Sequence, residues 1–183
     1  WSTRKRWLEA IVKADREMGA ERSDRSRFVA ASSAIELARP LRDAFNAVAL
    51  TAPLDRSLKL KKKHMEQALQ AYGQAADYGV AQVTTAATFE TADLYYQLSR
   101  DLLASERPRD LAADESEQYD VLLEEQAFPF EEKAIDLYRV NAERVADGVY
   151  DEWVRASYAR LAVMVPARWS RTERSEDVIT TID

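Results

Sequence analysis

The residues that could carry catalysis or bind a metal are few in this chain. It has no cysteine and a single histidine, His64. Disulfides, thiolate zinc sites and cysteine nucleophiles are therefore excluded, and a Ser–His–Asp triad would have to use His64. A metal-binding histidine on a helix favours a carboxylate one turn away, but the residue three positions earlier is Lys61. We interpret His64 as a solvated helix residue and expect neither a metal site nor catalysis.

Two pairs of adjacent glutamates are the other candidates for a metal or acid–base site. Glu124 and Glu125 form the first pair, and Glu131 and Glu132 form the second. Adjacent residues on a helix point about 100° apart, so the two members of a pair diverge. The ferritin-like pattern, in which a histidine follows a glutamate by three residues, is absent. The pairs therefore predict a solvated acidic helix face.

Residues 59–63 contain four lysines. Such a run can bind phosphate or an anionic lipid surface. Leu60 and Met65 are interleaved with it, which favours the charged flank of a helix with an apolar seam. No glycine-rich phosphate loop is present, because even the closest two glycines, Gly73 and Gly79, lack the Lys-Ser/Thr that follows such a loop. We expect no cofactor.

The bulk composition is that of a folded, helical and acidic chain. The 183 residues carry a net charge of −6, which argues against nucleic acid as a partner because phosphate binding requires a basic face. Four glycines and five prolines are too few for a β-sandwich or barrel, which needs a turn about every 8–12 residues. No apolar run approaches the roughly 18 residues of a membrane span.

Apolar residues recur at helical spacing along most of the chain and predict an all-α fold of about seven helices. Ser23 and Asp24 are expected to cap the second helix, and Asp114 a later one. Breaks or kinks are expected at glycines, prolines and one charged loop: Gly19, Pro40, Pro53, Gly79, residues 105–113, Pro129, Gly148 and Pro166. We divide the chain into N-terminal repeat-like helices (1–53), helix pairs (54–166) and a polar tail (167–183).

Two helix pairs share a pattern of small and aromatic residues. In the first, Tyr72 and Ala75 follow Ala68 by four and seven residues; in the second, Tyr138 and Asn141 follow Ala134 at the same spacing. A glycine turn follows each, and the next helix carries further members of the pattern: Thr88, Ala92 and Tyr95 in the first pair, and Trp153, Ala156 and Ser157 in the second.

Over roughly residues 55–165, this pattern resembles the tetratricopeptide repeat family. The resemblance implies a right-handed α-solenoid of antiparallel helix pairs. Asn141 departs from the small residue usual at its position, and the loop 105–114 stretches the period of the repeat.

A longer resemblance concerns residues 124–134 and 148–154, whose strings are EEQAFPFEEKA and GVYDEWV. They are similar to the C-terminal part of large tetratricopeptide-repeat proteins of the Gram-negative cell envelope. This implies a periplasmic or outer-membrane-associated scaffold, with partners among envelope motor or energy-transduction components; a cytoplasmic location stays open. The chain begins at Trp1, and we interpret it as a piece of a longer protein.

The resemblance also implies where a partner would bind. The first helices of the pairs would line a concave groove, with Phe89, Asp93 and Tyr96 on one helix and Val154 and Tyr158 on the last. The predicted function is a non-catalytic scaffold that holds a peptide or partner helix in this groove.

Two alternatives stay open: a self-associating structural module, and a helical enzyme or ligand carrier. Charge is uneven, with eight Lys/Arg against five Asp/Glu in residues 1–30 and five against thirteen in residues 106–147. We interpret both regions as solvated surface, and a docking role for them as the alternative.

Overall fold

The computed structural model describes residues 1–109 and 111–170, and every regular element among them is helical. Seven α-helices follow one another: α1 (Ser2–Glu17), α2 (Asp24–Asn46), α3 (Leu54–Ala76), α4 (Ala81–Leu103), α5 (Ala113–Glu143), α6 (Glu152–Met164) and α7 (Pro166–Trp169). Two short 3-10 helices, η1 (Gly19–Glu21) and η2 (Arg144–Asp147), extend α1 and α5. The prediction of an all-α fold is therefore confirmed. Most of the expected polar tail, residues 171–183, lies outside the described residues, while residues 167–169 belong to α7.

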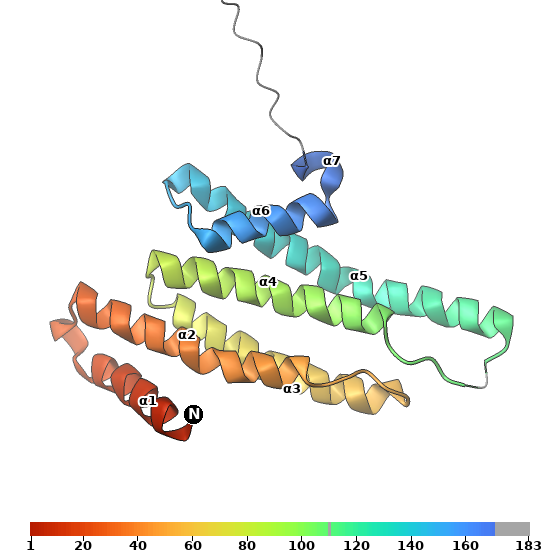
Figure 1. The fold of residues 1–183 in the computed structure, drawn as a ribbon, viewed down its shortest axis with the longest axis horizontal. Coiled ribbons are helices and arrows are strands. Elements are labelled where there is room, and N and C mark those ends of the chain that lie inside the picture. Colours follow the sequence, from red (N-terminus) through yellow and green to blue (C-terminus); the bar gives the residue numbers. More distant parts are fainter. Residues whose placement is uncertain (110, 171–183) are drawn as a thin grey trace, which may run out of the picture.

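The helices stack in chain order, in the solenoid-like arrangement that was predicted (Figure 1). α3 packs against both α2 and α4, and α5 packs against both α4 and α6. In addition, α2 contacts α4 and α4 contacts α6, so these three helices form a continuous layer. We call them the inner layer. It is covered on one side by α3 and α5.

Local sequence explains most of the helix boundaries. Ser23 caps α2, because its hydroxyl accepts a hydrogen bond from the Ser26 amide and the Ser26 hydroxyl accepts one from Ser23, each at 3.1 Å. α5 begins earlier than predicted. Its cap position is Ala112 rather than Asp114, because the Glu115 carboxylate accepts a hydrogen bond from the Ala112 amide at 2.9 Å.

Two prolines that were expected to kink or end helices lie inside continuous ones. α2 runs through Pro40, and α5 runs through Pro129 as a single helix of 31 residues. A proline removes one backbone hydrogen bond. The long helices on both sides of each proline keep their packing against neighbours, which offsets that loss.

Lys61 departs from the expected solvated flank, whereas Lys59, Lys62 and Lys63 are exposed as predicted. Lys61 is only 1% exposed. Its ammonium group donates to the carbonyl oxygens of Phe45 (3.0 Å) and Val48 (2.8 Å), at the C-terminal end of α2. It also pairs with the Asp101 carboxylate of α4 at 2.7 Å and lies 4.2 Å from the centre of the Phe45 ring.

The ammonium group thus provides a donor to the Val48 carbonyl and a second donor to the Phe45 carbonyl, which also accepts from the Val48 amide at 3.2 Å. Because it also pairs with α4, it fastens α2, α3 and α4 together.

Candidate functional site

Two arginine–carboxylate bridges connect the helices of the inner layer. Arg42 of α2 pairs with Glu90 of α4, and Arg160 of α6 pairs with Asp93 of α4, each at 2.8 Å. Burial alone would lower the pKa of the Arg42 guanidinium, but the hydrogen bond to Glu90 and its negative charge outweigh this and raise it. α4 therefore carries one carboxylate toward each neighbour, and the bridges fix the spacing of the three helices.

A buried tyrosine from the covering helices lies at each bridge. The Tyr138 hydroxyl of α5 donates to Asp93 at 3.1 Å. Tyr72 of α3 lies within reach of the charges of Glu90 and Arg42, but its hydroxyl has no hydrogen-bond partner among the described residues. Burial raises the pKa of both hydroxyls, and the nearby carboxylate raises it further. Each bridge thus has a buried tyrosine beside it, but the arginine precedes the carboxylate along the chain in the first bridge and follows it in the second.

A groove of about 220 Å³ lies between α2, α4 and α6, next to the first bridge. Its buried residues are Val83 and Ala86 of α4, which are apolar, together with Tyr72 and the bridge carboxylate Glu90, while Phe28 of α2 stays 46% exposed at its edge. The groove is smaller than a typical small-molecule site of about 300–1,000 Å³, so it fits side chains of a larger partner. The full lining comprises Phe28, Ser32, Ile35, Arg39, Tyr72, Gln82, Val83, Ala86, Glu90, Glu152 and Trp153. We call it the inner-layer groove.

The start of α6, which contributes two groove residues, is held by buried polar contacts. Asp151 caps α6 by accepting hydrogen bonds from the amides of Trp153 (3.0 Å) and Val154 (2.9 Å), and it accepts another from the Thr85 hydroxyl of α4. Asn141 of α5, fully buried, donates to the Thr85 carbonyl at 3.1 Å and to the Ser157 hydroxyl at 3.0 Å. These contacts set the position of Trp153 at the groove.

An aromatic cluster supports Trp153 from the other side. The ring of Phe89 lies 5.4 Å from that of Trp153 and 5.5 Å from that of Tyr138, both in tilted geometry. Tilted aromatic pairs at this separation are mutually favourable. Trp153 is therefore a fixed part of the groove wall.

Three of the five residues predicted to line a groove come together at the junction of α4 and α6. Phe89 joins the aromatic cluster, Asp93 belongs to the second bridge, and Tyr96 lies with its ring 5.1 Å beneath the Arg160 guanidinium. None of these three lines the inner-layer groove. The α4 residues that do are Gln82, Val83, Ala86 and Glu90.

The other two predicted residues lie elsewhere. Val154 is fully buried in the structure, so its placement on an open groove is corrected: the first turn of α6 points it into the core. Tyr158 is half-buried; its ring lies 5.5 Å from that of Trp169 in α7, and its hydroxyl donates to the Ala142 carbonyl at 3.3 Å.

The contribution of α2 to the groove was missed by sequence reasoning. Phe28, Ser32, Ile35 and Arg39 follow one another at intervals of four, three and four residues, which places them in one row along the helix. Phe28 and Ile35 fit the apolar spacing of a helix, but this pattern does not say which helix they would face.

No protein-family model, curated protein or solved structure matches the chain. Within residues 1–109 and 111–170, no cluster of three or more His, Asp or Glu side chains is arranged to hold a metal ion. None of the helices in the same range is both long and apolar enough to span a bilayer.

Proposed function

We propose that this chain is a non-catalytic protein-binding module that holds a peptide or a partner helix in the inner-layer groove. The observation that carries the proposal is the groove itself: a side-chain-sized hollow that combines apolar and polar lining and lies between three helices joined by ion pairs. Binding sites of this kind take one or two anchor side chains into a preformed hollow.

The lining suggests the chemistry of the anchor. Val83 and Ala86 provide buried apolar surface, Phe28 and Trp153 add aromatic surface, and the Glu90 carboxylate is already paired with Arg42. An aliphatic or aromatic side chain inserted there would displace water from apolar surface on several sides. Charged groups at the margin, Glu152 and Arg39, would contact polar parts of the same partner.

The resemblance to tetratricopeptide-repeat proteins supports a wider proposal. We propose that the chain is a repeat module of a larger Gram-negative envelope scaffold, located in the periplasm or at the outer membrane, with envelope motor or energy-transduction components as partners. The repeat character is supported by Tyr72 and Tyr138, which hold the same position of the sequence pattern and each lie beside an arginine–carboxylate bridge, although the order of arginine and carboxylate along the chain is reversed in the second bridge.

A peptide selection tests the groove directly. Peptides of about a dozen residues would be selected on the purified chain by display, and their dissociation constants measured by calorimetry against two groove variants, Phe28→Ala and Ser32→Arg. Val163→Ala and Ala159→Arg, at exposed positions of α6 outside the groove, serve as matched controls.

We expect each groove variant to weaken binding about tenfold or more, as for an anchor site, with little change in melting temperature. The controls should bind like the unmodified chain. Selected peptides that bind all four variants equally would contradict the groove. If Tyr96→Ala and Tyr158→Ala alone weaken binding, the site moves to the α4–α6 junction.

A further inference from the structure

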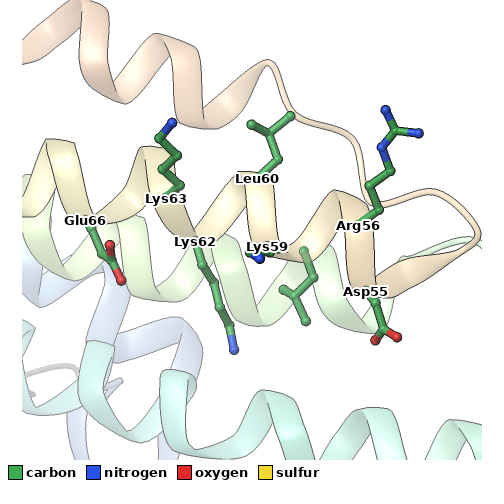
Figure 2. Close-up of a pocket in the computed structure, with 8 residues that line it drawn as sticks. Asp55, Arg56, Lys59, Leu60, Lys62, Lys63 and Glu66 are labelled. Carbon is green, nitrogen blue, oxygen red and sulfur yellow. The ribbon is translucent and has the colours of Figure 1, made fainter.

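Four cations without ion-pair partners in the described chain lie along α3 and are spread over both flanks of its exposed surface. Arg56, Lys59, Lys62 and Lys63 are all exposed, and none forms an ion pair with another described residue. Figure 2 shows Arg56 and Lys63 pointing to one side of α3 and Lys62 to the other. Leu60, 48% exposed, lies among them. We call these four cations the basic row.

The first half of α5 is the opposite in charge. Residues 113–132 contain eight Asp and Glu and no Lys or Arg. Asp120 alone among them forms an ion pair within the described chain, with Arg107. We call the carboxylates of this stretch the acidic row.

Large apolar side chains lie exposed among these carboxylates. Val121 is 49% exposed and Phe128 58%, and their separation of seven residues places them on the same side of the helix. Leu123 and Ala127 are the buried residues of this stretch. This side of α5 therefore has apolar surface and charge but no partner within the described chain.

The two rows lie next to each other on one face of the molecule. α3 and α5 both pack against α4 and run in the same direction (Figure 1). The Lys62 ammonium lies 5.5 Å from the centre of the Phe130 ring of α5, which sets the register of the two helices. Because both rise equally per residue, Arg56 to Lys63 are roughly level with Glu124 to Glu131.

We propose that this face pairs with the same face of a second copy of the chain. A two-fold axis running between and along α3 and α5 would place the basic row of each copy on the acidic row of the other, with Leu60 near Phe128. Such an interface is self-complementary and closes as a dimer. The neighbouring carboxylates disfavour a phosphate surface as the occupant, because they would repel it.

Charge exchange in the whole chain provides the test. One variant reverses the basic row (Lys59→Glu with Lys63→Glu), and another reverses the acidic row (Glu125→Lys with Glu132→Lys). The control, Lys13→Glu with Arg25→Glu, makes the same charge change as the basic-row variant, at exposed positions of α1 and α2 remote from the face. The oligomeric state would be measured by sedimentation velocity at about 1–100 µM chain, in low and high salt.

The unmodified chain and the control should form a dimer that weakens with salt. Each row variant should raise the dimer dissociation constant at least tenfold, while an equal mixture of the two variants should regain a dimer as a heterodimer. That rescue in trans distinguishes contact between copies from attraction within one copy. The test does not involve the groove, so its outcome is separate from that of the peptide selection.

A monomer at all concentrations, or a dimer that neither variant weakens, would overturn the proposal. A monomer that co-sediments with phosphatidylserine vesicles, and loses this binding in the Lys59→Glu, Lys63→Glu variant, would assign the basic row to anionic lipid instead.

Discussion

Tyr72 and Tyr138 hold the same position of the sequence pattern in two successive groups of packed helices. We call the group α2, α3 and α4 the first junction and the group α4, α5 and α6 the second junction, and we compare what the two share and where they differ. Both are buried at an arginine–carboxylate bridge of the inner layer. The Tyr138 hydroxyl has the carboxylate of Asp93 as a partner, whereas the Tyr72 hydroxyl has none among the described residues. The two junctions therefore share the position of a buried tyrosine, while the polar contacts around it differ.

The next position of the pattern shows the same divergence. Three residues after each tyrosine stand Ala75 and Asn141, both fully buried. Ala75 packs in an apolar cluster, whereas Asn141 joins α4, α5 and α6 by hydrogen bonds. The first junction places its polar contact elsewhere, on Lys61. The close approach of the helices thus constrains the size of these residues. In each junction a different side chain donates hydrogen bonds to backbone carbonyls.

The largest effect is expected from removing the polar contact of the first junction. Lys61→Ala removes the cation that pairs with Asp101 and donates to two carbonyls, while Asp101 keeps the Gln97 amide and the Phe45 carbonyl keeps the Val48 amide. We expect a loss of about 3 kcal/mol in the free energy of unfolding, from the lost hydrogen bonds to a charged group and the space left behind. Urea denaturation followed by circular dichroism measures this. Lys62→Ala, one position along and exposed, is the matched control and should change stability by less than about 0.5 kcal/mol. Equal effects of the two variants would contradict the role of Lys61.

A smaller loss is expected at the equivalent contact of the second junction. Asn141→Ala makes that junction like the first, and it removes the donor to the Thr85 carbonyl and the Ser157 hydroxyl. We expect a loss of about 2 kcal/mol, from the lost hydrogen bonds and the space left behind. The reverse change, Ala75→Asn, buries an amide in an apolar cluster and should also destabilise. A neutral Asn141→Ala would show that its hydrogen bonds are dispensable.

At high pH the two junctions should behave alike. Burial raises the pKa of both tyrosines above the ordinary value of 10.0, so the folded state retains protons that the unfolded state releases from about pH 10 upward. The stability contributed by each is complete below about pH 10 and is lost as the pH rises, at up to about 1.4 kcal/mol per pH unit per tyrosine.

Unfolding free energies of Tyr72→Phe and Tyr138→Phe, taken relative to the unmodified chain between about pH 8 and 11, check this. Each substitution should reduce the fall of the unfolding free energy with pH by the contribution of one tyrosine, because groups common to all three chains cancel in the difference. A variant that declines as steeply as the unmodified chain would show that its tyrosine is not protected.

At neutral pH the same substitutions should separate the two junctions. Tyr138→Phe removes a hydrogen bond to Asp93 and should cost about 1 kcal/mol, whereas Tyr72→Phe removes a buried hydroxyl without a partner and should be neutral or stabilising. Thermal and urea denaturation at pH 7 measure the difference. Equal losses would indicate that the Tyr72 hydroxyl has a partner in solution, such as a water molecule.

The fold was predictable because the spacing of apolar residues and the positions of the few helix breakers can both be identified in the local sequence, and together they determine where helices form. The positions of Pro40 and Pro129 inside helices were not, since packing on both sides of a proline decides whether a helix continues. Lys61 carried a signal that went unused: it shares a helix face with Met65 and Ala68, four and seven residues later. A lysine within a run of lysines can therefore be buried in the core when its position along the helix puts it on the apolar face.

The groove was harder to predict than the helices. Phe89, Asp93 and Tyr96 lie on a helix that also lines the inner-layer groove, but the α4 residues at that groove include Val83, Ala86 and Glu90. Which flank of α4 faces which neighbour depends on how the helices cross, and that is set by contacts far apart in the sequence, such as the Arg42–Glu90 bridge. Local patterns do not contain this information.

Because Lys61 is buried, the rate at which its amine is chemically modified reports how often the first junction opens. An amine-reactive reagent will modify Lys59, Lys62 and Lys63 at once, because they are exposed, but it can reach the Lys61 amine only when α2 and α3 separate. Peptide mapping resolves these neighbouring lysines. The delay of Lys61 behind the other three therefore times the opening of the first junction without any added label, and a change in that delay would report any partner that holds the junction closed.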